Sequence, residues 1–222
     1  MTATVTNPLD TTIDNPEARS LMQSAYENRY TWDEHFPGYT AQITVTTGDQ
    51  TYRGKVKVNA NLSVETDIED SAIKKEVLGQ LQEIAIHRVR RSFADTHGKN
   101  TFNFGETDAT GAVELIVGGK SAGDRYKIRH NEVCMVHRHI HGIVVTIDTQ
   151  SSHQTPEGYL SHQYHSIYRD PQTGEVKNES NYTDNYTQVG KYHILTDRTI
   201  TSLLDNPPRT ITFQFSDIQL LG

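Results

Sequence analysis

Apolar and polar residues alternate with two different periods along this chain, and each change of period marks a change of element. From Asn15 onward, apolar positions such as Ala18 and Met22 recur at the helical period of about 3.6 residues. Asn15 can cap this first helix, and Pro16 suits its first turn. The segment WDEHFPGY at 32–39 contains Pro and Gly and predicts that the helix ends before it.

The period changes to two at Tyr39. Apolar residues alternate with polar ones from Tyr39 to Val45, and a Gly-Asp turn follows at 48–49. A second alternating run covers 52–58, and a short third run covers 62–64. We expect these runs to form three antiparallel strands.

A second helix has a clear start signal. Thr66 and Glu69 have the spacing of a capping box, so the helix is expected to begin there and to end near Phe93 to Asp95. Three arginines near that end, Arg88, Arg90 and Arg91, are interpreted as solvated side chains that match the negative end of the helix dipole. Its predicted buried stripe is Ile73, Val77, Leu81, Ile84 and Ala85.

After Lys99 the chain contains only short alternating runs separated by Gly, Asn and Asp turns. We therefore predict an α+β fold in which two helices pack against a large curved antiparallel sheet, a half-barrel. Residues 1–14 lack periodicity and are expected to form a flexible N-terminal arm, and 15–222 a single domain. The predicted late strands are 102–104, 113–117, 126–129, 133–141, 143–147, 159–168, 175–187, 191–200 and 209–215.

The composition of the chain excludes several classes of protein function. Lys and Arg number 21 against 28 Asp and Glu, and this net charge of −7 argues against a nucleic-acid surface. The single Cys134 excludes an internal disulfide and a paired-cysteine zinc site. No apolar run approaches the roughly 18 to 20 residues of a membrane span, and the start lacks a signal-peptide pattern. A cytoplasmic location is the resulting expectation.

Seven of the eleven histidines fall between 130 and 165. On a strand, His137, His139 and His141 share one face, with neighbours about 6.6 Å apart. Two of them can hold zinc or another divalent transition metal if His162 or His165 on a neighbouring strand supplies a third ligand. The same row can instead be a polar surface, part of a ligand pocket or a pH-responsive cluster.

The other chemical motifs are weak. Gly119 to Gly123 matches the GxSxG pattern, but a strand rather than the required helix follows it, so a hairpin is the interpretation. Four carboxylates, Asp33, Glu34, Asp124 and Asp184, show no spacing that selects a catalytic pair and are interpreted as turn or surface residues. No catalytic residue is predicted, and a non-enzymatic role is favoured.

Aromatic residues recur on the late strands, among them Tyr164, Tyr186 and Tyr192. A concave sheet face that carries tyrosines, histidines and aliphatic side chains under a helix can hold an apolar small molecule. The alternative is an ordinary core with the tyrosine hydroxyls at its rim.

Three segments, Ala25 to Ile43, Glu157 to Val176 and Tyr182 to Ile200, resemble a domain-of-unknown-function family of cyanobacteria and plant plastids. The likeness extends over about 15–222 and implies a photosynthetic cell, but it supplies no catalytic residues. The order of elements also resembles the half-barrel of bacterial lipoprotein carriers, which hold acyl chains in a concave sheet.

The leading hypothesis is a non-enzymatic protein that binds a lipid or pigment in the concave sheet. The predicted ligand-binding residues are His137, His139, His141, Tyr164, Tyr186 and Tyr192. One alternative is a metal-binding protein, or a metal-dependent enzyme, that uses the histidine row. Another is a protein-assembly partner; the oligomeric state is left open.

Overall fold

A computed structural model of the chain describes residues 11–222, and the first ten residues of the predicted arm lie outside the described part. It contains one antiparallel sheet with the strand order β3-β2-β1-β12-β11-β10-β9-β8-β7-β6-β5-β4. The helices are α1 (Pro16–Glu27), α2 (Ser71–Arg88) and α3 (Phe93–His97). The strands are β1 (Gly38–Thr47), β2 (Gln50–Asn59), β3 (Val64–Thr66), β4 (Asn100–Thr107), β5 (Val113–Gly119), β6 (Arg125–Arg129), β7 (Glu132–Ile140), β8 (Ile143–Thr155), β9 (Gly158–Arg169), β10 (Val176–Val189), β11 (Tyr192–Ser202) and β12 (Arg209–Leu220).

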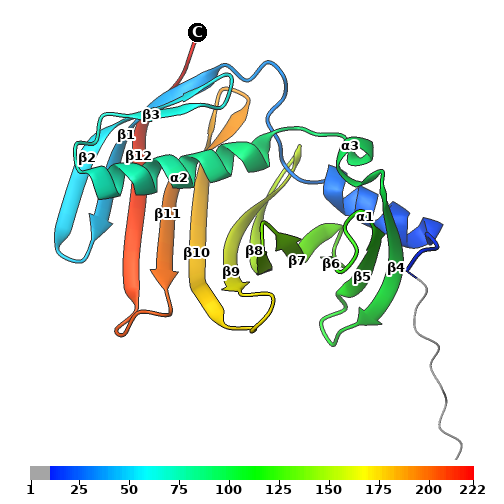
Figure 1. The fold of residues 1–222 in the computed structure, drawn as a ribbon. Helices are drawn as coiled ribbons and strands as arrows, with labels where there is room; N and C mark the ends of the chain where they lie inside the picture. Colours follow the sequence, from blue (N-terminus) through cyan, green and yellow to red (C-terminus); the bar gives the residue numbers. More distant parts are fainter. Residues whose placement is uncertain (1–10) are drawn as a thin grey trace, which may run out of the picture.

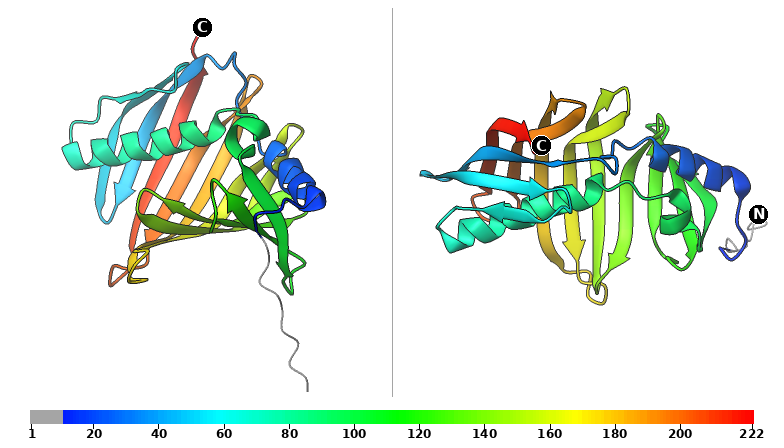
Figure 2. Two further views of the ribbon diagram at one scale, coloured as in Figure 1. Left: turned by 45° about the vertical axis from the view of Figure 1, so that its right-hand side comes forward. Right: turned by 90° about the horizontal axis from the view of Figure 1, so that it is seen from above.

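The sheet curves around its helices. In Figure 1, α2 crosses the inner face in front of β12, β11 and β10, while α1 and α3 lie at the end formed by β4 and β5. The views in Figure 2 show the same curvature from two further directions. The predicted α+β class with a large curved antiparallel sheet is confirmed, and the structure adds the short helix α3.

Two separate hydrophobic clusters cover the inner face. The first joins α2, through residues such as Val77 and Leu81, to β1, β2 and β9–β12. The second joins Ala18 and Met22 of α1 to Phe102 and Leu115 of β4 and β5. The predicted stripe of α2 is buried as expected.

Helix α2 begins at Ser71, five residues after Thr66, which the capping-box prediction named as its cap. Thr66 is the last residue of β3, and its hydroxyl donates to the Lys55 carbonyl oxygen. The Asp70 carboxylate accepts from the backbone N–H groups of Ala72 and Ile73 instead. Asp70 therefore satisfies the unpaired amides of the first turn, because pairing with β2 holds Thr66 in a strand.

Replacing Asp70 with alanine is expected to lower the free energy of unfolding by about 1 kcal/mol, because two helix amides lose their acceptor. Urea denaturation followed by circular dichroism measures this change. Glu69→Ala is the matched control, since Glu69 would matter in the predicted capping box but lies outside the observed one. An equal loss in both variants would contradict the observed cap.

The second helix also ends earlier than predicted. Arg88 is its last residue, Val89 is extended, and the Arg88 carbonyl accepts from the Trp32 backbone N–H at 2.8 Å. A new cap at Ser92 then starts α3, which buries Phe93. The segment that was expected to be one long helix is thus divided by its pairing with Trp32.

Tight turns join the central hairpins. His141 and Gly142 both have positive φ, as the two central residues of a two-residue hairpin turn require. His141 therefore lies in the turn after β7 rather than on the strand, and the prediction that it shares a strand face with His137 and His139 is wrong.

Residues 11–14 of the predicted arm run along the edge strand β4. The Thr101 hydroxyl donates to the Thr11 carbonyl at 2.6 Å, and the Phe102 backbone N–H donates to the Asp14 carboxylate at 2.8 Å. These contacts cover backbone groups that an edge strand otherwise leaves open to pairing with other chains. In the described part of the chain, none of the helices is long and apolar enough to cross a membrane.

Candidate functional site

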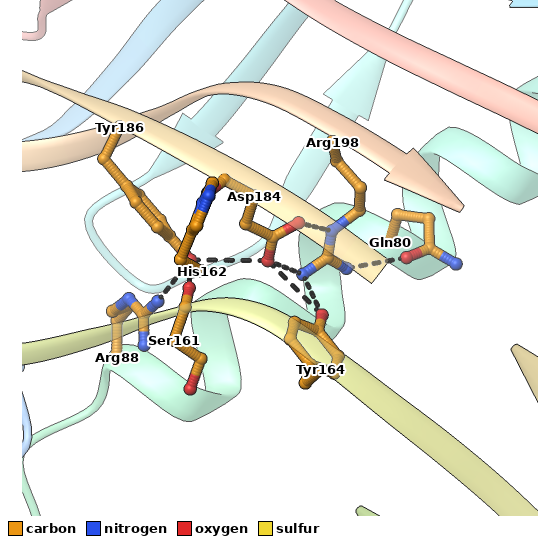
Figure 3. A network of polar contacts seen from close by, with 8 residues as sticks. All are labelled: Gln80, Arg88, Ser161, His162, Tyr164, Asp184, Tyr186 and Arg198. Carbon is orange, nitrogen blue, oxygen red and sulfur yellow. Dashed lines mark hydrogen bonds and ion pairs between the residues drawn. The ribbon is translucent and has the colours of Figure 1, made fainter. Parts of the chain in front are cut away.

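A buried ion pair lies on the inner face of the sheet beneath α2 (Figure 3). Arg198 on β11 donates to both carboxylate oxygens of Asp184 on β10, at 2.9 and 2.7 Å. Their side chains are 4% and 2% exposed. Their Cα positions are directly opposite in the β10–β11 register, which puts both side chains on one face of the sheet.

Side chains from three elements complete this network. Gln80 of α2 accepts from Arg198 at 2.7 Å, and the Tyr164 hydroxyl of β9 accepts from Arg198 at 2.9 Å. The Tyr186 hydroxyl contacts Asp184 at 3.3 Å and accepts from Arg88 of α2 at 3.0 Å. The network therefore fastens α2 to the sheet at two points.

The two tyrosines and the carboxylate of this network are not poised to act as an acid or a base. Burial raises the pKa of Tyr164 well above its usual value and also raises that of Tyr186, so both hydroxyls stay protonated. The buried Asp184 carboxylate contacts three partners, Arg198, Tyr164 and Tyr186. We conclude that these groups stabilise the position of α2.

Two carboxylates that were interpreted as surface or turn residues are buried. Asp184 is 1% exposed and Asp124 is 3% exposed. Asp124 lies in a turn, as expected, but it pairs with Arg138 at 3.1 Å and accepts from the His139 backbone N–H. Burial is tolerated in both cases because each carboxylate has a guanidinium partner.

A cavity of about 450 Å³ opens beside this network, between the end of α2 and the loop that follows α1. Its aromatic wall is the stacked pair Trp32 and Phe36, whose ring centroids are 3.9 Å apart. Arg88 belongs to the wall as well as to the network, and Arg90 lies beside it. The complete lining is Trp32, Asp33, Glu34, Phe36, Ala60, Leu62, Arg88, Val89 and Arg90.

A second cavity of about 590 Å³ lies over β1, β2 and β12. Most of its lining is charged or polar, including Lys55, Lys57, Glu65 and Asp217. The first cavity is smaller, but only it has an aromatic wall, which is typical of small-molecule sites.

The predicted ligand-binding residues are not brought together. Tyr164 and Tyr186 are part of the buried network, whereas the Tyr192 hydroxyl donates to Asp33 beside the first cavity at 2.9 Å. His137 pairs in register with Thr146 and contacts its hydroxyl at 2.9 Å, on the outer face of the sheet. These histidines cannot fix a head group together with Tyr164, because the sheet separates them.

The predicted metal ligands are also dispersed. The ring centroids of His137 and His139 are 5.6 Å apart, but neither His162 nor His165 joins them. The His162 ring is hydrogen-bonded through Nδ1 to the Asp184 carbonyl, while His165 on the opposite face pairs with Glu179 at 3.0 Å. Over residues 11–222, no group of three or more His, Cys, Asp or Glu side chains is placed to hold a metal ion.

No curated protein matches this sequence. A LolA superfamily protein from Nitrosomonas europaea is 12% identical with a TM-score of 0.40, over 92% of this chain and 94% of its own. A putative outer membrane lipoprotein-sorting protein domain from Vibrio parahaemolyticus is 12% identical with a TM-score of 0.38, over 92% of each chain. The family described as "Protein of unknown function (DUF3386)" matches residues 13–221, and the chain belongs to that family.

Proposed function

We propose that this protein binds an amphipathic small molecule, such as a lipid or pigment, without catalysing a reaction. The observation that carries the proposal is the cavity walled by Trp32, Phe36 and Leu62. Its volume of about 450 Å³ falls within the roughly 300 to 1,000 Å³ typical of small-molecule pockets. The proposal includes a cytoplasmic location in a photosynthetic cell, and the sequence resemblance supports the photosynthetic setting.

The place of binding differs from the one expected from the sequence. Buried core residues and the Arg198 network occupy the inner face beneath α2, so the ligand is assigned to the cavity at the end of that helix. The aromatic wall is rigid there: Phe36 contacts the Tyr192 ring edge-on at 5.1 Å, and Trp32 donates its indole N–H to the His193 carbonyl. A rigid apolar wall binds a ligand with little loss of side-chain entropy.

The single tryptophan makes a direct test available, because Trp32 is the only source of indole emission. Dibromostearate is expected to quench Trp32 fluorescence with saturation near one equivalent, since bromine atoms quench at close range. Unbrominated stearate should bind with the same affinity without this quenching. Native mass spectrometry gives the stoichiometry.

Two variants complete the test. Leu62→Gln keeps the size of the side chain but makes the cavity wall polar, so saturable quenching should be lost or strongly weakened. Ile143→Gln is the control, because Ile143 is an exposed apolar residue of the β8 hairpin outside the cavity lining. The proposal fails if wild type gives no saturable quenching or if the two variants behave alike.

A further inference from the structure

The cavity wall carries charges of both signs. A charged group can bind a ligand only if other residues of the protein do not already pair with it. Two carboxylates, Asp33 and Glu34, and two guanidinium groups, Arg88 and Arg90, line it. The chemistry of the polar end of the bound molecule rests on the proposed function.

Neither carboxylate is available to a ligand in the cavity: Asp33 is paired with neighbouring side chains, and Glu34 points to solvent. Asp33 accepts from Lys191 at 2.5 Å, from the Tyr192 hydroxyl at 2.9 Å and from the His35 backbone N–H at 3.0 Å. Hydrogen bonds from Lys191 and then Tyr192 hold the pKa of Asp33 below its usual range, so its charge is present and is balanced by Lys191. The Glu34 side chain is 87% exposed and points to solvent.

The arginines keep most of their donors. A guanidinium group has five N–H donors, and Arg88 uses one of them on the Tyr186 hydroxyl. Arg90 is exposed and forms neither a hydrogen bond nor an ion pair with any residue in the described part of the chain. The negative end of the α2 dipole explains why positive charges occur here. It does not explain the unused N–H donors of Arg88 and Arg90.

We propose that Arg90, together with the remaining donors of Arg88, binds the anionic head group of an amphiphile whose apolar part contacts Trp32, Phe36 and Leu62. A carboxylate or a phosphate accepts two parallel hydrogen bonds from a guanidinium group, which a neutral alcohol does not. The ligand class is therefore a long-chain acid or phosphate ester. Arg88 supplies a fixed charge, because its bond to Tyr186 and its position over the Tyr186 ring restrain the side chain.

Three probes with the same ten-carbon chain test this head-group assignment: decanoate, decyl phosphate and 1-decanol. Each is added to the full chain below the critical micelle concentration of the probe, and binding is followed by Trp32 emission. Wild type should bind decanoate or decyl phosphate about tenfold more tightly than decanol. The preferred anion then distinguishes a carboxylate from a phosphate head group. The affinity for the anions should also fall with added salt, whereas that for decanol should not.

The variant Arg90→Gln should reduce this tenfold preference to near unity and leave decanol binding unchanged. Arg209→Gln, an exposed arginine of β12, is the control and should behave like wild type. Equal affinities for all three probes in wild type, with binding still lost in Leu62→Gln, would overturn the head-group assignment and leave the proposed function standing. An absence of binding by every probe would overturn both.

Discussion

Replacing Asp184 with alanine is expected to lower the free energy of unfolding by about 3 to 5 kcal/mol. The change leaves the Arg198 guanidinium, which is 4% exposed, without its carboxylate partner. Arginine cannot escape this cost by losing its proton, because a guanidinium group stays protonated in proteins. Its remaining hydrogen-bond acceptors, Gln80 and Tyr164, are neutral.

The reciprocal change, Arg198→Met, should cost less and should depend on pH. The unpaired Asp184 carboxylate can take up a proton, which removes the buried charge. The loss of stability in this variant should therefore shrink as the pH is lowered toward 5. Urea denaturation of both single variants at pH 7 and pH 5 measures this asymmetry.

The double variant, Asp184→Leu with Arg198→Met, replaces the ion pair by apolar side chains and should recover most of the lost stability. Lys177→Ala breaks an exposed ion pair with Glu175 and is the control, which should leave the unfolding free energy unchanged. Two single variants as stable as the control would show that the pair does not hold α2 in place.

The strands after Lys99 could be predicted because their period of two follows from the sheet geometry itself. Helix α3 could not, since five residues are too few to display a helical period. Its only local signal is the pair Ser92 and Asp95, in which the Ser92 hydroxyl caps the Asp95 amide at 3.0 Å. A short helix of this kind depends on burying Phe93 in the second hydrophobic cluster.

The Arg198 network could be predicted from the sequence only in part. Asp184 has the same strand parity as Tyr182 and Tyr186, and an acidic residue on an aromatic strand face indicates a buried carboxylate that has a partner. The identity of its partner depends on the β10–β11 register, which shifts between Asn185 and Tyr186. Such a bulge leaves no local signature that fixes the pairing.

The cavity was not predictable from local patterns. Its wall comes from three separate segments, 32–36, 60–62 and 88–90. The pairing of Trp32 with Val89 brings two of them together.

The parity of His162 and His165, in contrast, was visible in the sequence. The two residues are three positions apart on one strand, and an odd separation directs their rings to opposite faces of the sheet.

Acidification should destabilise the protein through His97, which is 5% exposed within the second hydrophobic cluster region. Its ring lies 5.1 Å from Tyr26 and 5.8 Å from Phe102. Its Nδ1 atom accepts from the Asn100 side-chain amide at 3.2 Å, and the Asn100 amide oxygen is held by the Ser121 backbone N–H. This arrangement suits a neutral imidazole, because a proton on Nδ1 would face the Asn100 donor.

Burial, followed by the charges of Arg138 and Arg29, lowers the pKa of His97 from 6.5 to about 4. The unfolded chain therefore binds more protons than the folded protein between pH 6.5 and pH 4. The free energy of unfolding should fall by about 3 kcal/mol as the pH decreases through this window, and this group should have no effect above it. Urea denaturation at closely spaced pH values measures the slope.

His97→Gln retains an amide acceptor for Asn100 but cannot take up a proton in this range, so its unfolding free energy should fall less steeply between pH 6.5 and pH 4. His35→Gln is the control, because the His35 side chain is 77% exposed, and it should keep the wild-type slope. The pKa of Glu83 is raised by burial, which changes stability in the opposite sense, and both variants retain that residue. The difference in slope between the two variants therefore isolates His97, and parallel curves would show that this imidazole does not govern the acid sensitivity of the fold.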